Sequence, residues 1–172
     1  IQLTSRLPSL WDGAGGTTIN GYSQPGAQPN TDAVISNARI MIQIRGNGPS
    51  SFDGMLIQSA GNRVQGLAIF NMHRSIWISG TAATNNSIVG NFIGTDATGM
   101  FGLTVQTSNA IGVAMDLGAN GNHVGGTLPA ERNVISGNAY NGIDFKSQGT
   151  DGNLIFNNLV GLNPGGTKTL AN

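Results

Sequence analysis

The chain has 172 residues, no cysteine, and eight basic residues that balance eight acidic ones, so its formal net charge is zero. A neutral chain with only 9% charged residues offers no electrostatic attraction for nucleic acid or an anionic membrane surface, and it contains no apolar run long enough to span a membrane. The length suits one domain, and without cysteine its stability cannot come from disulfides.

Residues 1–52 predict an irregular leading coil. Ile1 and Leu3 alternate as a first strand, residues 17–19 predict a second, and alternating isoleucines at 40–44 predict a third. A stretch bearing Pro and Gly, residues 22–37, interrupts the pattern, and further insertions follow at 94–109 and 127–132. We expect these three segments to be loops on the outside of the fold, where recognition usually occurs.

Residues 53–172 carry one pattern four times. Each copy has an Asn followed two residues later by a β-branched residue, and the copies are spaced by 24, 36 and 31 residues. Each copy also holds three short apolar segments in a constant order, separated by turns rich in Gly, Asn, Ser and Thr. The segments are 54–57, 62–66 and 67–69; 75–78, 86–90 and 91–93; 112–115, 122–126 and 133–135; and 142–145, 153–157 and 158–160.

Segments this short cannot bury an apolar face alone, but they can do so by stacking on the next copy. The sequence therefore predicts an all-β fold, a single-stranded parallel β-helix of about five coils that forms one domain over residues 1–172. The inward side chains should form a narrow aliphatic core. They are Met55, Ile57, Val64 and Ile69; Ile76, Ile78, Ile88 and Ile93; Val113, Met115, Val124 and Ile135; and Ile143, Phe145, Ile155 and Val160.

The two ends suggest a segment of a larger protein. The chain starts without Met, and residues 161–172 resemble the link at 94–109 that leads into another copy. An uncapped end would expose unpaired strand edges. We therefore expect further coils of the same chain, or neighbouring subunits, to pack against the ends of the rod.

Asparagines recur at two positions of the repeat. At turns, Asn tolerates left-handed backbone angles, and stacked amides can form hydrogen-bonded ladders. We interpret both columns as structural ladders, with sugar binding by the amides as the alternative. The columns are Asn62, Asn86, Asn122 and Asn153, and Asn91, Asn133 and Asn158.

Three runs resemble those of bacterial right-handed parallel β-helix repeat proteins, which belong to the broad pectate-lyase-like superfamily. They are GYSQPGAQPN at 21–30, GNFIGTDATG at 90–99 and RNVISGN at 132–138. The resemblance covers nearly the whole chain. It implies right-handed winding and an extracellular or cell-surface location, but no particular activity, since one scaffold hosts many functions.

One outward column on the face of the first segments holds the candidate binding residues. Asp144 should align there with Ala114, Trp77 and Leu56. An exposed pair of Trp77 and Leu56 is typical of a contact surface or of a site under a loop, here the loop with Phe101 and Leu103. A platform for a sugar or a protein partner is the alternative.

Catalytic groups are harder to assemble. An inverting glycoside hydrolase needs two carboxylates about 6.5–9.5 Å apart, and this column supplies only Asp144, which is a weak catalytic candidate. We expect Asp116 to pair with Lys146. A lyase-like site would need a carboxylate cluster with a basic residue, but Asp53, Asp144 and Arg74 are expected to be dispersed. His73 and His123 belong to different faces.

We predict no metal site and no cofactor. Asp96, within residues 94–99, is explained by an Asx-type turn, and no spacing of histidines suits zinc. The favoured hypothesis is a non-catalytic structural or adhesive module of a secreted or cell-surface bacterial protein, with weak glycan or protein binding through Trp77, Leu56 and Asp144. The alternative is a segment of a polysaccharide lyase or glycoside hydrolase that uses Asp144.

Overall fold

The computed structural model describes residues 1–48, 52–102 and 110–172, and their regular structure is almost entirely β. Three parallel sheets account for the strands. Two short 3-10 turns, η1 (Gly21–Ser23) and η2 (Pro129–Glu131), are the helical elements of the described residues. The described part of the chain has no helix of membrane-spanning length and hydropathy.

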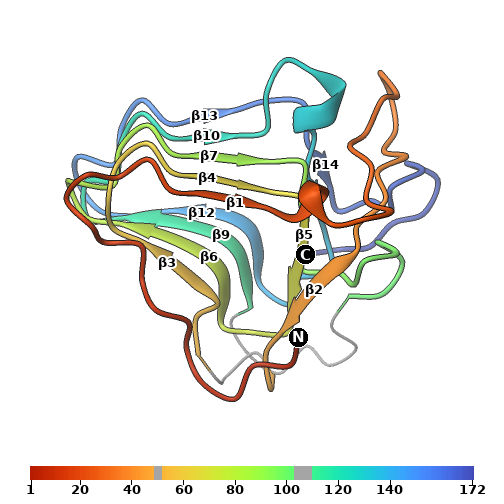
Figure 1. Ribbon diagram of the computed structural model, residues 1–172, viewed down its shortest axis with the longest axis horizontal. Helices are drawn as coiled ribbons and strands as arrows, with labels where there is room; N and C mark the ends of the chain where they lie inside the picture. Colours follow the sequence, from red (N-terminus) through yellow and green to blue (C-terminus); the bar gives the residue numbers. More distant parts are fainter. Residues whose placement is uncertain (49–51, 103–109) are drawn as a thin grey trace.

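The chain visits the three sheets in rotation (Figure 1). Sheet 1 holds β3 (Met55–Ile57), β6 (Arg74–Ser79), β9 (Ile111–Asp116) and β12 (Asn141–Phe145). Sheet 2 holds β1 (Thr18–Asn20), β4 (Arg63–Gln65), β7 (Ser87–Val89), β10 (His123–Val124) and β13 (Leu154–Ile155). Sheet 3 holds β2 (Ile42–Arg45), β5 (Leu67–Phe70), β8 (Phe92–Ile93), β11 (Val134–Ile135) and β14 (Leu159–Val160). This arrangement is consistent with a parallel β-helix.

The register stacks like residues upon one another. In sheet 2, Ile88 lies opposite Val124, and Val124 lies opposite Ile155. All twelve inward residues predicted for the first three copies are buried, none more than 3% exposed. Burying side chains of this size stabilises the fold by about 1.5–3 kcal/mol each, so the stacked aliphatic core is the main source of stability.

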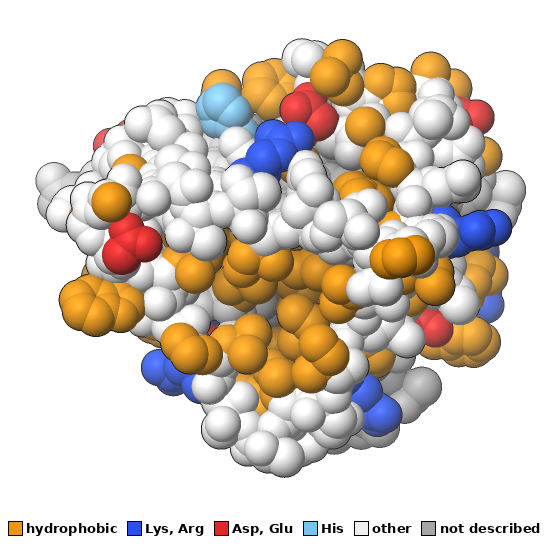
Figure 2. All heavy atoms as spheres, viewed as in Figure 1, with side chains coloured by type: hydrophobic (Ala, Val, Ile, Leu, Met, Phe, Trp, Pro, Cys, Tyr) orange, Lys and Arg blue, Asp and Glu red, His pale blue; other side chains and the backbone are white. Residues whose placement is uncertain are grey.

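The two ends of the stack are more open. At the last copy, Phe145, Ile155 and Val160 are 42%, 45% and 48% exposed, because β12, β13 and β14 are the outermost strands of their sheets among the described residues. Figure 2 views the face that carries β1 and β2, where hydrophobic side chains gather in the middle. The predicted core positions of the last copy are therefore partly solvent-exposed.

Asparagine side chains join successive copies. Asn62 Nδ2 donates to Asn86 Oδ1 at 2.9 Å, Asn86 bonds Asn122 in the same way, and Asn122 bonds Asn153. The second column repeats the arrangement from Asn91 to Asn133 and from Asn133 to Asn158. A further bond of this kind, from Asn138 to Asn172, was not predicted. Buried amides need such partners, so the bonds fix the vertical register of the turns.

The leading coil is less regular than predicted. The segment with Ile1 and Leu3 forms no strand, only a bridge from Gln2 to Arg45, and a second bridge joins Leu10 to Ile57. The other two predicted strands are present as β1 and β2.

The excursion at 22–37 packs over the outside of sheet 3. Ala68, Phe92 and Val134, which lie side by side on that face, are buried in a second apolar cluster with Tyr22 and Ile40. The buried guanidinium of Arg132 fastens the excursion by donating to the carbonyl oxygens of Asp32, Ala33 and Ile35. This loop is thus a cover for one sheet.

Candidate functional site

The outward column of sheet 1 has the predicted alignment, and its members differ in exposure. Leu56 lies opposite Trp77, Trp77 opposite Ala114, and Ala114 opposite Asp144. Leu56 is only 7% exposed, so it does not form the expected surface patch with Trp77. Ala114 is likewise buried, at 5% exposed, so Trp77 and Asp144 are the partly exposed members of the column.

Arg74 covers one face of the Trp77 indole. The guanidinium carbon of Arg74 lies 3.4 Å from the centre of a Trp77 ring, a cation–π contact that is stronger when partly desolvated. Phe101 is exposed instead of packing on the indole, and Leu103 lies outside the described residues. The ring face under Arg74 is therefore closed to a stacked ligand.

Arg74 is itself held by a buried carboxylate. Its Nε and a terminal nitrogen donate to Asp53 at 2.6 and 2.9 Å, and His73 Nδ1 lies 3.1 Å from the same carboxylate. Burial opposes ionisation of Asp53, but the Arg74 guanidinium and His73 outweigh it and keep the pKa of Asp53 below its ordinary value. The predicted dispersion is therefore wrong for Asp53 and Arg74, whereas Asp144 lies two strands away from Arg74, on β12.

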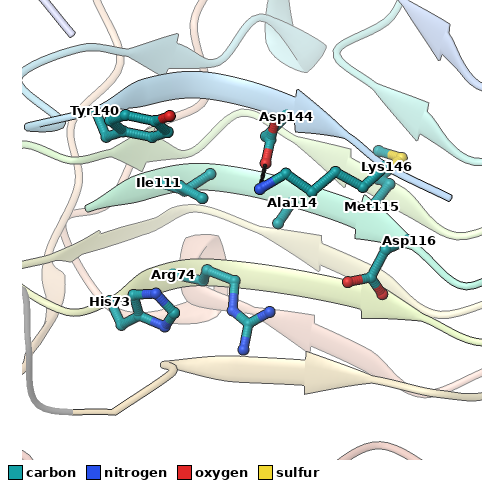
Figure 3. A pocket seen from close by; sticks show the side chains of 9 residues that line it. All are labelled: His73, Arg74, Ile111, Ala114, Met115, Asp116, Tyr140, Asp144 and Lys146. Atoms are coloured by element: carbon teal, nitrogen blue, oxygen red, sulfur yellow. Dashed lines mark ion pairs between the residues drawn. The ribbon is translucent and has the colours of Figure 1, made fainter. Parts of the chain in front are cut away.

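His73 and Arg74 border a hollow of about 150 Å³ on sheet 1 (Figure 3), which we call the sheet 1 hollow. His73 and Arg74 lie on one side, at the start of β6, while Tyr140 and Asp144 lie across β9 on the other. Tyr140 is 56% exposed. The hollow is lined by His73, Arg74, Ile111, Ala114, Met115, Asp116, Tyr140, Asp144 and Lys146.

The acidic residues of the hollow have different partners from those predicted. Lys146 Nζ lies 2.8 Å from Asp144 Oδ2, and this hydrogen bond and the charge of Asp144 raise the pKa of Lys146. Asp116 accepts from Trp77 Nε1 at 2.9 Å and from Ser79 Oγ at 2.6 Å. The predicted ion pair between Asp116 and Lys146 is therefore replaced by two separate contacts.

The two carboxylates of the hollow are diagonal neighbours. Asp144 lies opposite Ala114, two residues before Asp116 on β9. Diagonal positions on neighbouring strands have backbones about 7–8 Å apart, which places the two side chains in neighbouring columns of the same face. A second carboxylate is thus near Asp144, although it stands in the next column. Both carboxylates already accept hydrogen bonds from other side chains of the protein.

Sequence reasoning missed Tyr140 as a site residue and assigned Lys146 to the wrong partner. Tyr140 lies in the turn before β12, outside the alternating pattern that identified the strands. An isolated aromatic residue within a polar turn was the available signal.

Metal binding finds no geometric support within the described ranges, which hold no cluster of three or more His, Asp or Glu side chains suited to an ion. Asp96 Oδ1 accepts from Thr98 Oγ1 at 2.7 Å and from the amide of Phe101. These are turn contacts of the expected kind.

The two histidines lie in different places. His73 borders the sheet 1 hollow, while His123 borders a separate hollow on sheet 2.

Comparison with known proteins adds no family to this geometry: no protein-family model, no curated protein and no solved structure matches the chain.

Proposed function

We propose that the chain is a right-handed parallel β-helix of the pectate-lyase-like superfamily, acting as a non-catalytic structural or adhesive module of a secreted or cell-surface bacterial protein. It binds a glycan weakly in the sheet 1 hollow. The three parallel sheets with stacked side chains, and the three sequence runs named above, support the fold and setting. The observation that carries the binding role is the exposed Tyr140 beside charged groups of both signs.

The chemistry of the hollow suits a sugar. The Tyr140 ring offers an apolar surface and a hydroxyl, as expected of an aromatic residue at a wet interface. Asp144 and Asp116 can accept hydrogen bonds from sugar hydroxyls, and Lys146 can donate to them. The hollow, about 150 Å³, is smaller than the roughly 300–1,000 Å³ of typical ligand pockets. It therefore fits about one sugar ring and predicts weak binding.

The alternative, a polysaccharide-degrading enzyme, rests on the diagonal placement of Asp116 and Asp144. Catalysis would require one of these groups to be free as an acid or base, and the other to activate water. Asp144 is bonded to Lys146, and Asp116 to Trp77 and Ser79. Because both carboxylates serve as acceptors within the protein, we favour binding.

A glycan-array screen followed by calorimetric titration tests this proposal. Tyr140→Ala should abolish binding of any glycan that the array identifies. Trp11→Ala removes an exposed aromatic residue outside the hollow and should leave the affinity unchanged. Equal binding by the Tyr140→Ala variant and the unmodified protein would contradict the assignment of the sheet 1 hollow.

We also propose that the ends of the stack pack against further coils or neighbouring subunits. The exposed Ile155 and Val160 beside open strand edges support this, because such edges pair readily. Sedimentation should show concentration-dependent association that Ile155→Lys abolishes. A protein that remains unassociated at high concentration would contradict self-association.

A further inference from the structure

A second hollow, of about 280 Å³, lies on the outer face of sheet 2, and we call it the sheet 2 hollow. Its lining includes small residues, Ser87 and Gly125 among them. Arg63 and Glu131 line its polar part, and Leu154 and Phe156 line its apolar part, with His123 also at its border. The hollow therefore combines polar and apolar surface in a space nearly twice that of the sheet 1 hollow.

The register explains this shape. Arg63, Ser87, His123 and Leu154 lie opposite one another in four successive strands. In this outward column, the short side chain of Ser87 lies among the longer side chains of Arg63, His123 and Leu154. Gly125 has a positive φ of 78°, and a Cβ there would collide with the carbonyl oxygen of Phe156. This position therefore requires Gly, and no side chain of residue 125 fills the hollow.

The polar part of the hollow carries one positive side chain, Arg63, and one negative side chain, Glu131, whose charges balance. Arg63 lies 3.8 Å from Glu131, while its Nε donates to Gln65 at 2.8 Å. Glu131 also accepts from the amide of Leu128. An ionic ligand would meet the opposite charge of this pair as well as the like one. A neutral polyhydroxyl ligand can accept from the guanidinium and donate to the carboxylate at once.

The apolar part offers a surface for a hydrocarbon face. Leu154 and Phe156 are 43% and 39% exposed, and the buried Val89 lines the hollow with them. A hexose ring has both features that this site requires, a face of C–H groups and a rim of hydroxyls. Aromatic contact supplies the first, and the Arg63 and Glu131 pair meets the second.

We propose that the sheet 2 hollow is a second binding site, selective for neutral glycans. One hexose packs on Phe156, and its hydroxyls bond Arg63 and Glu131. The site shares no residue with the sheet 1 hollow, so this inference stands independently of the glycan site proposed there.

The two histidines allow each hollow to be followed separately. The chain contains only His73 and His123, one at each site. We would titrate the isotopically labelled protein at constant pH with cellotetraose, mannotetraose and maltotetraose, and with tetragalacturonate as the acidic probe. At least one neutral tetrasaccharide should shift the ring signals of His123 saturably, whereas tetragalacturonate should not.

Variants then locate the contact. Phe156→Ala should weaken the His123 response by about tenfold, the upper range for an aromatic contact. Arg63→Leu should weaken it through the other end of the site, which provides a second test if Phe156→Ala is poorly folded. Tyr140→Ala, the control, should leave the His123 response unchanged.

Two results would overturn the inference. One is the absence of a His123 shift with all three neutral tetrasaccharides. The other is a His123 shift that both Phe156→Ala and Arg63→Leu leave intact. Shifts at His73 alone would reject the sheet 2 site and support the sheet 1 site. Shifts at His123 alone would support the sheet 2 site and reject the sheet 1 site.

Discussion

The indole nitrogen of Trp77 on β6 lies 2.9 Å from a carboxylate oxygen of Asp116 on β9, so the two residues join neighbouring strands across sheet 1. Ser79 donates to the same oxygen. The carboxylate that would serve as the second acid of a hydrolase is thus a structural acceptor. This contact is the main reason for favouring binding over catalysis.

Replacing Trp77 by Phe tests whether the hydrogen bond from Trp77 to Asp116 stabilises the fold. The variant keeps an aromatic ring under Arg74 but removes the donor to Asp116. We expect the free energy of unfolding to fall by about 1.5–3 kcal/mol, the range for a hydrogen bond to a charged group, with glycan binding through Tyr140 retained. Denaturant unfolding and calorimetry measure the two effects, and Trp11→Phe at an exposed position is the control. Unchanged stability would mean that the bond is not structural.

Ile88→Asp should be among the most damaging substitutions. It places an unpaired charge between Val64 and Val124 in the fully buried core, so we expect a loss of about 4 kcal/mol or more, or failure to fold. Ser87→Asp, one residue earlier on the outer face of β7, should change stability by about 0.5 kcal/mol. Thermal unfolding compares them, and equal effects would contradict the inward and outward assignment.

The stacked core could be predicted from sequence because it depends on local alternation and on a repeat that brings like residues together. Val64, Ile88 and Val124 were recognisable for that reason. The contacts on the outer faces were not, because they depend on the paths of long side chains. Lys146, for example, follows β12 directly and reaches back to Asp144 on that strand instead of to Asp116 on β9.

The loops were less predictable still. Their Gly and Pro content identified residues 22–37 as an excursion, but not the sheet on which it packs. Its anchor, Arg132, is about a hundred residues away from the carbonyl oxygens of Asp32 and Ala33. The exposure of the last copy, including Ile155, also could not be predicted. The alternation of apolar and polar residues shows which way a side chain faces, but not whether another coil covers it.

Arg132→Met should release the excursion. It removes the donors to three carbonyl oxygens and to Asn157, so the excursion loses the part-buried hydrogen bonds that hold it to the rest of the fold. Hydrogen exchange of the amides at 30–37 should accelerate, and proteolysis near the exposed Val34 should increase. Arg39→Met, at an exposed guanidinium with a single long bond, is the control. Identical exchange in both variants would show that Arg132 does not anchor the loop.

Tyr22 predicts a loss of stability at alkaline pH. Burial raises its pKa to about 12, and its hydroxyl donates to the carbonyl oxygen of Gly90 at 2.6 Å. The pKa in the unfolded chain is about 10, so the stabilisation is complete below about pH 10 and is lost as the pH rises through about 12. The loss amounts to roughly 3 kcal/mol.

Absorbance titration of a Tyr140→Phe variant isolates Tyr22, since the chain has two tyrosines. Alkaline unfolding of Tyr22→Phe should lack the loss described above. Ionisation of Tyr22 near pH 10 in the folded protein, at the ordinary value for tyrosine, would contradict its burial.

The most direct test of the proposed function is product analysis. The protein and its Asp144→Asn variant would be incubated with any polysaccharide whose fragments bind the sheet 1 hollow, and reducing ends and unsaturated products would be measured. We predict binding without release of either product, from both proteins. Products formed by the unmodified protein and lost in Asp144→Asn would establish a catalytic role for Asp144 and contradict the proposal of a binding module.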